Sequence, residues 1–345
     1  MTKPFFSICI AAFNAGVYFD DCLWSIVAQD CRDYEVVIID DGSVDPLILD
    51  EGIVGVLPAV RIERVSNGGP YAARQKAFDL ARGEVLVCVD SDDKLFDRSM
   101  LSKLKDAFIS HGADVVIYNA TCDERRVTKL LDLSGLGGGG SVDEGAVWRT
   151  YTKGYSLNSL WCKAFKRALY TKGEKPRPRL LMAEDRLQSL EVMRNARSYW
   201  LIDEPLYFYR PNPASTTNGG YNPSYFHQTC YVEDEVLEFM HGRGIPIGEW
   251  ASYFLSAASG ALLGIRYNGS LSRTERWAAY EAIGREHALG VAMGLRCNCN
   301  LSLIDGLRLS LIEEGKFRLL DLSMLPWKAG SVLKHLPEKV RSKGK

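Results

Sequence analysis

The sequence has few of the residue patterns that zinc sites, redox-active thiols and covalent catalysis need. Its 345 residues include five histidines, and no serine or cysteine stands in the glycine-flanked turn typical of an exposed nucleophile. The nine cysteines contain no CxxC pair, and the one tight spacing, Cys297-Asn298-Cys299, lacks a second pair for zinc. We therefore expect reduced thiols in a cytoplasmic protein, with neither a catalytic triad nor a structural zinc site.

The sequence also lacks an excess of charge and a long apolar run. A formal net charge of −1 gives no general attraction to nucleic acid, so we expect no nucleic-acid partner. The apolar stretch at 250–265 is too short and too rich in small residues to predict a transmembrane helix. The apolar start at 5–13 indicates a first strand rather than a signal peptide, because polar residues follow it without a cleavage site.

The first third of the chain alternates between short apolar runs and amphipathic stretches. This alternation predicts an α/β fold, a mostly parallel sheet flanked by helices. The expected strands lie at 5–13, 34–43, 60–66, 84–90 and 113–120, and the expected helices at 17–29, 70–82 and 98–110. Ligands of such sheets bind at the carboxyl ends of the strands.

The alternation ends after about residue 121. A glycine-rich stretch at 135–141 predicts a flexible connection or a tight loop, and residues 155–217 mix helix and strand. From residue 223 the pattern is helical, with stretches near 225–241, 248–267, 272–289 and 300–314. We therefore expect a first domain over 1–220 and a mainly helical C-terminal region over 221–345.

Acidic residues stand at the ends of two expected strands. Asp40 and Asp41 follow one strand, and Asp90, Asp92 and Asp93 follow another. Carboxylate oxygens suit a hard divalent cation, which commonly bridges to phosphate oxygens. The alternative is that the second group only caps the following helix.

Four motifs occur in order along this part of the chain: ICIAAFN at 8–14, VVIIDDGSVD at 36–45, SNGGPYAARQKAFDLARGE at 66–84 and DSDD at 90–93. Together they resemble the family 2 inverting glycosyltransferases, which use the GT-A nucleotide-sugar fold. The resemblance is strong over residues 5 to about 125 and weak over about 155–217. It implies a GT-A catalytic domain over 1–220, with a nucleotide-binding half at about 1–125 and an acceptor half at about 126–220.

The resemblance also implies an activity. It is a metal-dependent, inverting transfer of a sugar from a nucleotide-diphosphate donor, a UDP-sugar in the first instance, to a hydroxyl of a glycan or lipid-linked glycan acceptor. The setting it implies is the synthesis of bacterial surface polysaccharide or lipopolysaccharide.

The same resemblance implies roles for individual residues. The implied nucleotide-sugar-binding set is Ala11, Phe13, Asn14, Asp40, Asp41, Gly68, Gly69, Arg74, Asp90, Ser91, Asp92 and Arg210. Within it, Asp41 would accept a hydrogen bond from the base, and Arg74 would bind the nucleotide or brace the acids. Asp92, with Asp93 or alternatively Asp90, would hold Mn²⁺ or Mg²⁺ against the diphosphate.

An inverting transfer needs a base that takes the proton of the attacking hydroxyl. In LLMAEDRLQSL, residues 180–190, Glu184 and Asp185 open an expected helix. The resemblance implies that Asp185 is the base and Glu184 its partner, and a helix N-terminus stabilises an ionised carboxylate. The alternative is a helix cap without chemistry.

Two further segments have alternative interpretations. Residues 205–220 resemble the segment that closes over donor and acceptor in relatives, where Arg210 would pair with the diphosphate. They are equally compatible with a surface strand and turn. Trp161 would either stack on an acceptor sugar or lie in the core.

The C-terminal region carries apolar stripes at 248–267 and 272–289 that must be covered. They could pack on the catalytic domain, form a homodimer face or bind lipid. Residues 328–345 contain six Lys or Arg against one Glu. That pattern fits either peripheral docking on the inner face of the plasma membrane or a solvated tail.

Other classes fit the motifs less well. A catalytically inactive relative that binds only nucleotide or glycan would not need Asp41, Asp92 and Asp185 together. An Mg-dependent aspartyl-phosphate type phosphatase needs its D-x-D near the first strand. A sugar-phosphate nucleotidyltransferase begins with a Gly-rich, Arg-containing loop that residues 11–16 lack, and no G-x-G-x-x-G indicates a Rossmann dehydrogenase.

Overall fold

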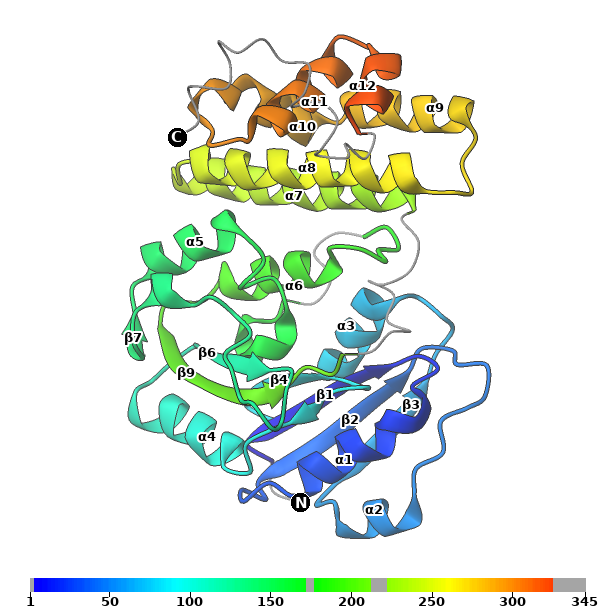
Figure 1. The fold of residues 1–345 in the computed structure, drawn as a ribbon. Coiled ribbons are helices and arrows are strands. Elements are labelled where there is room, and N and C mark those ends of the chain that lie inside the picture. The colour runs from blue at the N-terminus through cyan, green and yellow to red at the C-terminus, as the bar shows by residue number, and fades with distance from the viewer. Residues whose placement is uncertain (1–2, 172–176, 212–221, 325–345) are drawn as a thin grey trace.

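A computed structural model describes residues 3–171, 177–211 and 222–324 of the chain, shown in Figure 1. In these ranges one sheet has the strand order β3-β2-β1-β4-β8-β6-β9-β5, and β7 pairs with β9. The strands are β1 (Phe6–Ala12), β2 (Tyr34–Asp40), β3 (Val60–Arg64), β4 (Val85–Asp90), β5 (Lys94–Leu95), β6 (Val115–Thr121), β7 (Gly140–Val142), β8 (Lys163–Lys166) and β9 (Tyr199–Phe208).

The helices belong to two groups. Those that surround the sheet are α1 (Phe19–Val27), α2 (Glu51–Val56), α3 (Pro70–Leu80), α4 (Met100–Ser110), α5 (Glu144–Lys153) and α6 (Glu184–Met193). Those of the C-terminal region are α7 (Pro223–Arg243), α8 (Gly248–Tyr267), α9 (Arg273–Gly284), α10 (His287–Gly294), α11 (Leu303–Glu313) and α12 (Phe317–Ser323).

The first strands form the parallel block that the alternating pattern predicts. β1 pairs in parallel with both β2 and β4, and β2 pairs in parallel with β3. Side chains of one strand alternate between two apolar clusters, because successive residues point to opposite faces. Ile10 packs with α1 and α4 on one face, whereas Cys9 packs with Phe78 of α3 on the other.

The second part of the sheet is mixed. β8 lies antiparallel between β4 and β6, and β9 runs parallel to β6 before it pairs with β5. This course brings the end of β9 back to the end of β4. The glycine-rich stretch ends in the edge strand β7, with φ of 97°, 121° and 91° at Gly137, Gly139 and Gly140. These left-handed conformations favour glycine.

The C-terminal region is helical, as predicted. α7 and α8 lie across the part of the chain that forms the sheet (residues 3–171 and 177–211, the sheet part), next to α6 and α5, and α9 to α12 cover their other side (Figure 1). The single helix expected at 272–289 is two helices, because Glu286 is extended (φ −65°, ψ 132°) and starts a new helix. The sequence pattern did not predict α2 or α12. Among the described helices, none is long and apolar enough to cross a membrane.

A buried ion pair joins the helical region to the sheet part. Arg186 of α6 and Glu233 of α7 approach to 2.7 Å, with side-chain exposures of 2% and 0%. The indole of Trp250, on α8, donates a hydrogen bond to Glu233 over 2.8 Å. The apolar cluster under the sheet also continues to Trp250 and Phe254. The apolar stripe of α8 is therefore covered by α5 of the sheet part and by α9, α10 and α11 of the C-terminal region.

We predict that Glu233→Ala lowers the free energy of unfolding by about 3–5 kcal/mol, because it leaves the buried guanidinium of Arg186 without its counterion. Denaturant unfolding measures the change. The matched control is Glu249→Ala, which breaks an exposed pair with Lys153 (3.1 Å) and should cost under about 1 kcal/mol. Equal effects of the two substitutions would contradict a structural role for the buried pair.

Candidate active site

The ends of β1, β2 and β4 lie level with one another at the carboxyl edge of the sheet. Ala11 is in register with Asp90, and Ala12 with Asp40. The two groups of acids inferred from the sequence therefore start from one edge, where ligands of parallel sheets bind.

Asp40 and Asp41 are both engaged with the backbone of loops at this edge. Asp40 accepts hydrogen bonds from the N–H groups of Ser43 (2.9 Å) and Leu47 (3.3 Å), which shapes the loop after β2. Asp41 accepts from the N–H groups of Gly68 (2.8 Å) and Gly69 (2.9 Å). The glycine loop is thus pinned to the end of β2, and a nucleobase would have to share the carboxylate of Asp41 with it.

The loop after β1 is shaped in a similar way. Asn14 takes a left-handed conformation (φ 49°), and its side-chain oxygen accepts a hydrogen bond from the N–H of Val44 over 2.9 Å. Its own N–H donates to the hydroxyl of Ser43. Phe13 is 51% exposed, so its ring is available to a ligand at this edge.

Arg74 connects Asp90, at the end of β4, with the acid pair Glu184 and Asp185. It lies on α3, one turn after the glycine loop, and is 7% exposed. One terminal nitrogen donates to Asp90 over 3.1 Å. The other forms an ion pair with Asp185 and lies 3.7 Å from Glu184. Of the two roles inferred for this arginine, the contacts favour bracing the acids.

Burial sets the protonation of two of these acids. It is the main cause that raises the pKa of Glu184 to about 7, with the charge of Asp185 adding to it and that of Arg74 opposing it. Burial likewise raises the pKa of Asp90, against the attraction of Arg74. The site can therefore hold or release a proton near neutral pH.

Asp93 differs from its neighbours, because its carboxylate is 1% exposed and directed into the protein. It accepts hydrogen bonds from the hydroxyl of Tyr207 and from the N–H of Arg210, both at 2.8 Å. The hydroxyl of Tyr207 also accepts from the N–H of Asp90. These contacts join the end of β9 to the end of β4 and do not fit the predicted role of Asp93 as a metal ligand. The geometry favours Asp90 beside Asp92 instead.

The sequence pattern missed the part that Tyr207 plays. The only available signal was its place in the aromatic run Tyr207-Phe208-Tyr209, which also fits an ordinary core strand. Trp161 is buried and stacks on Tyr207 at 4.9 Å, so its core interpretation fits the structure.

Arg210 holds the turn that contains Ser91 and Asp92. Its Nε–H donates to the backbone oxygen of Asp92 over 2.8 Å, and its terminal nitrogen forms an ion pair with Asp21. The guanidinium also lies 4.4 Å from the ring centroid of Tyr18. Most of the segment expected to close over the substrates, residues 212–220, lies outside the described residues.

Glu184 and Asp185 open α6 as expected. Ala183, directly before them, has a φ of 62°, an uncommon value for a residue with a side chain. This conformation turns the chain so that both acids meet Arg74. Asp185 also lines a cleft of about 910 Å³ beside α7 and α8.

The donor set suits a hard cation only in part. No group of three or more His, Cys, Asp and Glu side chains in the described ranges is arranged to hold a metal ion. Asp90 and Asp92 supply carboxylates at one turn, and Mg²⁺ is commonly bound by one or two carboxylates together with substrate phosphates. The residues therefore fit a cation that binds together with a diphosphate.

Comparison with known proteins agrees with this geometry. Residues 7–159 match the model of glycosyl transferase family 2. The chain is 26% identical to the uncharacterized glycosyltransferase EpsJ of Bacillus subtilis over 232 residues, which are 64% of this chain and 65% of EpsJ. It is 32% identical to a PGL/p-HBAD biosynthesis glycosyltransferase of Mycobacterium tuberculosis over 120 residues, 34% of this chain and 47% of that protein. The chain thus spans less than two thirds of these curated relatives.

Among solved structures, residues 1–349 of S. aureus TarS in complex with UDP-GlcNAc superpose with a TM-score of 0.70. The identity is 20%, and the match covers 94% of this chain and 92% of that one, so it includes the helical region. Residues 7–159 therefore form a family 2 glycosyltransferase domain, and the structure has the GT-A fold. Both the family and the fold class predicted from the sequence are confirmed.

We predict that the stability of the protein falls between about pH 4 and pH 9, measured without metal, in part because of Asp93. Burial, reinforced by the charge of Asp90, raises the pKa of Asp93 to about 8, so the folded state binds a proton that the unfolded state has lost. The stabilisation by protonated Asp93 is fully present below about pH 4, the ordinary pKa of an aspartate in the unfolded chain. It is lost as the pH rises through about 8, the pKa of Asp93 in the folded state. Asp93→Asn should flatten that part of the melting-temperature profile, whereas an unchanged slope would contradict the assignment. Asp106→Asn, at an exposed acid of α4, is the control.

Proposed function

We propose that this protein is a metal-dependent, inverting glycosyltransferase that moves a sugar from a UDP-sugar to a hydroxyl of a glycan acceptor. The observation that carries the proposal is the position of Arg74, which contacts an acid at the end of β4 and the acid pair at the start of α6. Donor binding and proton removal would therefore take place side by side.

Two features support a nucleotide-diphosphate donor. The glycine loop pinned by Asp41 leads into the N-terminus of α3, where backbone N–H groups favour anions. The TarS structure of the same fold contains UDP-GlcNAc. In the proposed arrangement, Ala11, Phe13 and Asn14 form the floor under the nucleoside.

Mn²⁺ or Mg²⁺, bound by Asp92 and Asp90, would supply positive charge that stabilises the diphosphate as a leaving group. The turn that carries these acids is held by Arg210 and, through Asp93, by Tyr207. Fixing this turn before the substrates bind reduces the reorganisation needed during the reaction.

Asp185 would act as the base. The acceptor oxygen attacks the anomeric carbon from the side opposite the diphosphate, the bond from that carbon to the diphosphate oxygen breaks, and UDP leaves with the electron pair. Because the attack comes from that opposite side, the configuration at the anomeric carbon inverts, and Asp185 takes the hydroxyl proton. Arg74 positions Asp185, and Glu184, with a pKa of about 7, is a second proton-holding group beside it.

An inactive relative that only binds nucleotide remains the alternative. It would not require Asp185 and Glu184 to be held at the turn that carries Asp90. A role in the synthesis of bacterial surface polysaccharide is a further proposal, and the names of the bacterial relatives support it only as far as glycosyltransferase activity.

We expect Asp92→Ala to abolish the Mn²⁺-dependent part of UDP binding, because it removes a half-buried carboxylate from the proposed cation site. Calorimetric titration of UDP with and without Mn²⁺ measures this. Asp106→Ala should bind as the wild type does. If Asp92→Ala and the wild type bind UDP equally well in Mn²⁺, the metal assignment is wrong.

Asp185→Asn should retain UDP binding within about twofold and lower sugar transfer by at least about 10²-fold, since an amide cannot accept the proton. Transfer is measured with a UDP-sugar panel, and UDP release without acceptor is followed in parallel. Transfer at the wild-type rate would exclude Asp185 as the base.

A further inference from the structure

A cleft of about 910 Å³ lies between the start of α6 and the helices α7 and α8. It is within the range of about 300–1,000 Å³ that is typical of small-molecule sites. Its lining residues are Lys153, Tyr155, Asn158, Met182, Ala183, Asp185, Arg186, Tyr225, Phe226, Thr229, Glu233, Tyr253, Ser256, Ala257, Gly260 and Ala261. None of them comes from β1, β2, β4 or the glycine loop.

One lining residue of the cleft, Asp185, also contacts the nucleotide edge through its ion pair with Arg74. Arg186 and Glu233 also line it, but their charges are paired with each other. Asp185, in contrast, is held by Arg74 from the nucleotide side. A molecule in the cleft would therefore reach the proposed base from the side opposite the donor.

The chemistry of the walls suits a sugar ring. Tyr155 and Tyr253 form an edge-to-face pair with centroids 4.9 Å apart, and Tyr155 is 65% exposed. Asn158 and Thr229 also line the cleft. The amide oxygen of Asn158 accepts a hydrogen bond from Arg186, and the hydroxyl of Thr229 donates one to the backbone oxygen of Tyr225. Tyrosine offers an apolar face together with a polar edge, which matches the apolar faces and hydroxyl edges of carbohydrates.

We propose that this cleft is the acceptor site and that it binds the end of a glycan, with a sugar ring stacked on the Tyr155–Tyr253 pair. This proposal rests on the proposed function and adds to it the place where the acceptor binds and the residues that contact its sugar ring. It also makes the helical region, through α7 and α8, part of the active site.

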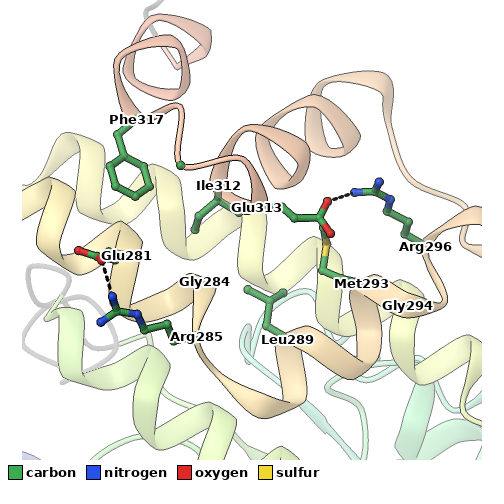
Figure 2. Close-up of a pocket in the computed structure, with 12 residues that line it drawn as sticks. Glu281, Gly284, Arg285, Leu289, Met293, Gly294, Arg296, Ile312, Glu313 and Phe317 are labelled. Carbon is green, nitrogen blue, oxygen red and sulfur yellow. Dashed lines mark hydrogen bonds and ion pairs between the residues drawn. The ribbon is translucent and has the colours of Figure 1, made fainter.

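A second hollow, of about 600 Å³, lies among α9 to α12 and lacks these features (Figure 2). Its charged side chains are paired at the rim, Glu281 with Arg285 and Glu313 with Arg296. Leu289, Met293 and Phe317 contribute to its apolar wall. It contains none of the residues of the candidate active site, which is why we assign the acceptor to the first cleft.

Gly260 of α8 gives a direct test, because a side chain added there meets no atom within 4 Å and would extend into the cleft. Gly260→Trp should abolish binding of methyl glycosides of glucose, galactose and N-acetylglucosamine, measured by saturation-transfer NMR on the whole chain. The control is Gly248→Trp, which places the same side chain on an exposed site at the start of α8, outside the cleft.

Tyr155→Ala should raise the Kd of the best methyl glycoside by about 3- to 10-fold, because a ring contact contributes about 0.5–1.5 kcal/mol. UDP titration of every variant reports separately on the donor site, so a failed donor assignment does not affect this result. Sugar binding that survives Gly260→Trp, or that is absent from the wild type, would overturn the acceptor assignment. If octyl glycosides bind and methyl glycosides do not, the cleft recognises an alkyl chain rather than a sugar ring. That result would overturn the proposed stacking on Tyr155 and Tyr253.

Discussion

The arrangement of the site depends on one buried cation, the guanidinium of Arg74. Asp90, Glu184 and Asp185 approach one another in a poorly solvated place, where their mutual repulsion is strong. Arg74 contacts all three acids, and its positive charge allows the end of β4 and the start of α6 to lie close together. Because Asp41 fixes the loop at the start of α3, the same helix sets the position of the nucleotide edge relative to α6.

Arg186, the residue after the proposed base, links the start of α6 to the helical region on the other side. Successive residues of a helix point about 100° apart, so Asp185 and Arg186 leave α6 on different sides. Asp185 forms an ion pair with Arg74 of α3, whereas Arg186 forms one with Glu233 of α7. Two neighbouring ion pairs thus hold the start of α6 between the sheet and the helical region. A shift of α7 would be transmitted to the base through Arg186.

The sequence predicted the strand ends and the acids at them, because parallel strands bring their carboxyl ends to one edge. It could not predict that Asp93 turns inward, since side chains no longer alternate once a strand ends. The partner of Asp93, Tyr207, lies 114 residues away and carries no distinguishing pattern. The break at Glu286 was missed for a related reason: apolar periodicity continues across a short interruption, and only the backbone angles reveal it.

The division of the chain has a consequence for substrate choice. The family model covers residues 7–159, which include every residue of the proposed nucleotide edge except Arg210. Most of the cleft, in contrast, is built by α6, α7 and α8, outside that range. Substitutions along α7 and α8 could therefore alter the acceptor while Arg74 and the acids around it stay in place. In this arrangement the helical region would determine which acceptor hydroxyl reaches Asp185, and the carboxyl edge of the sheet would determine which donor binds.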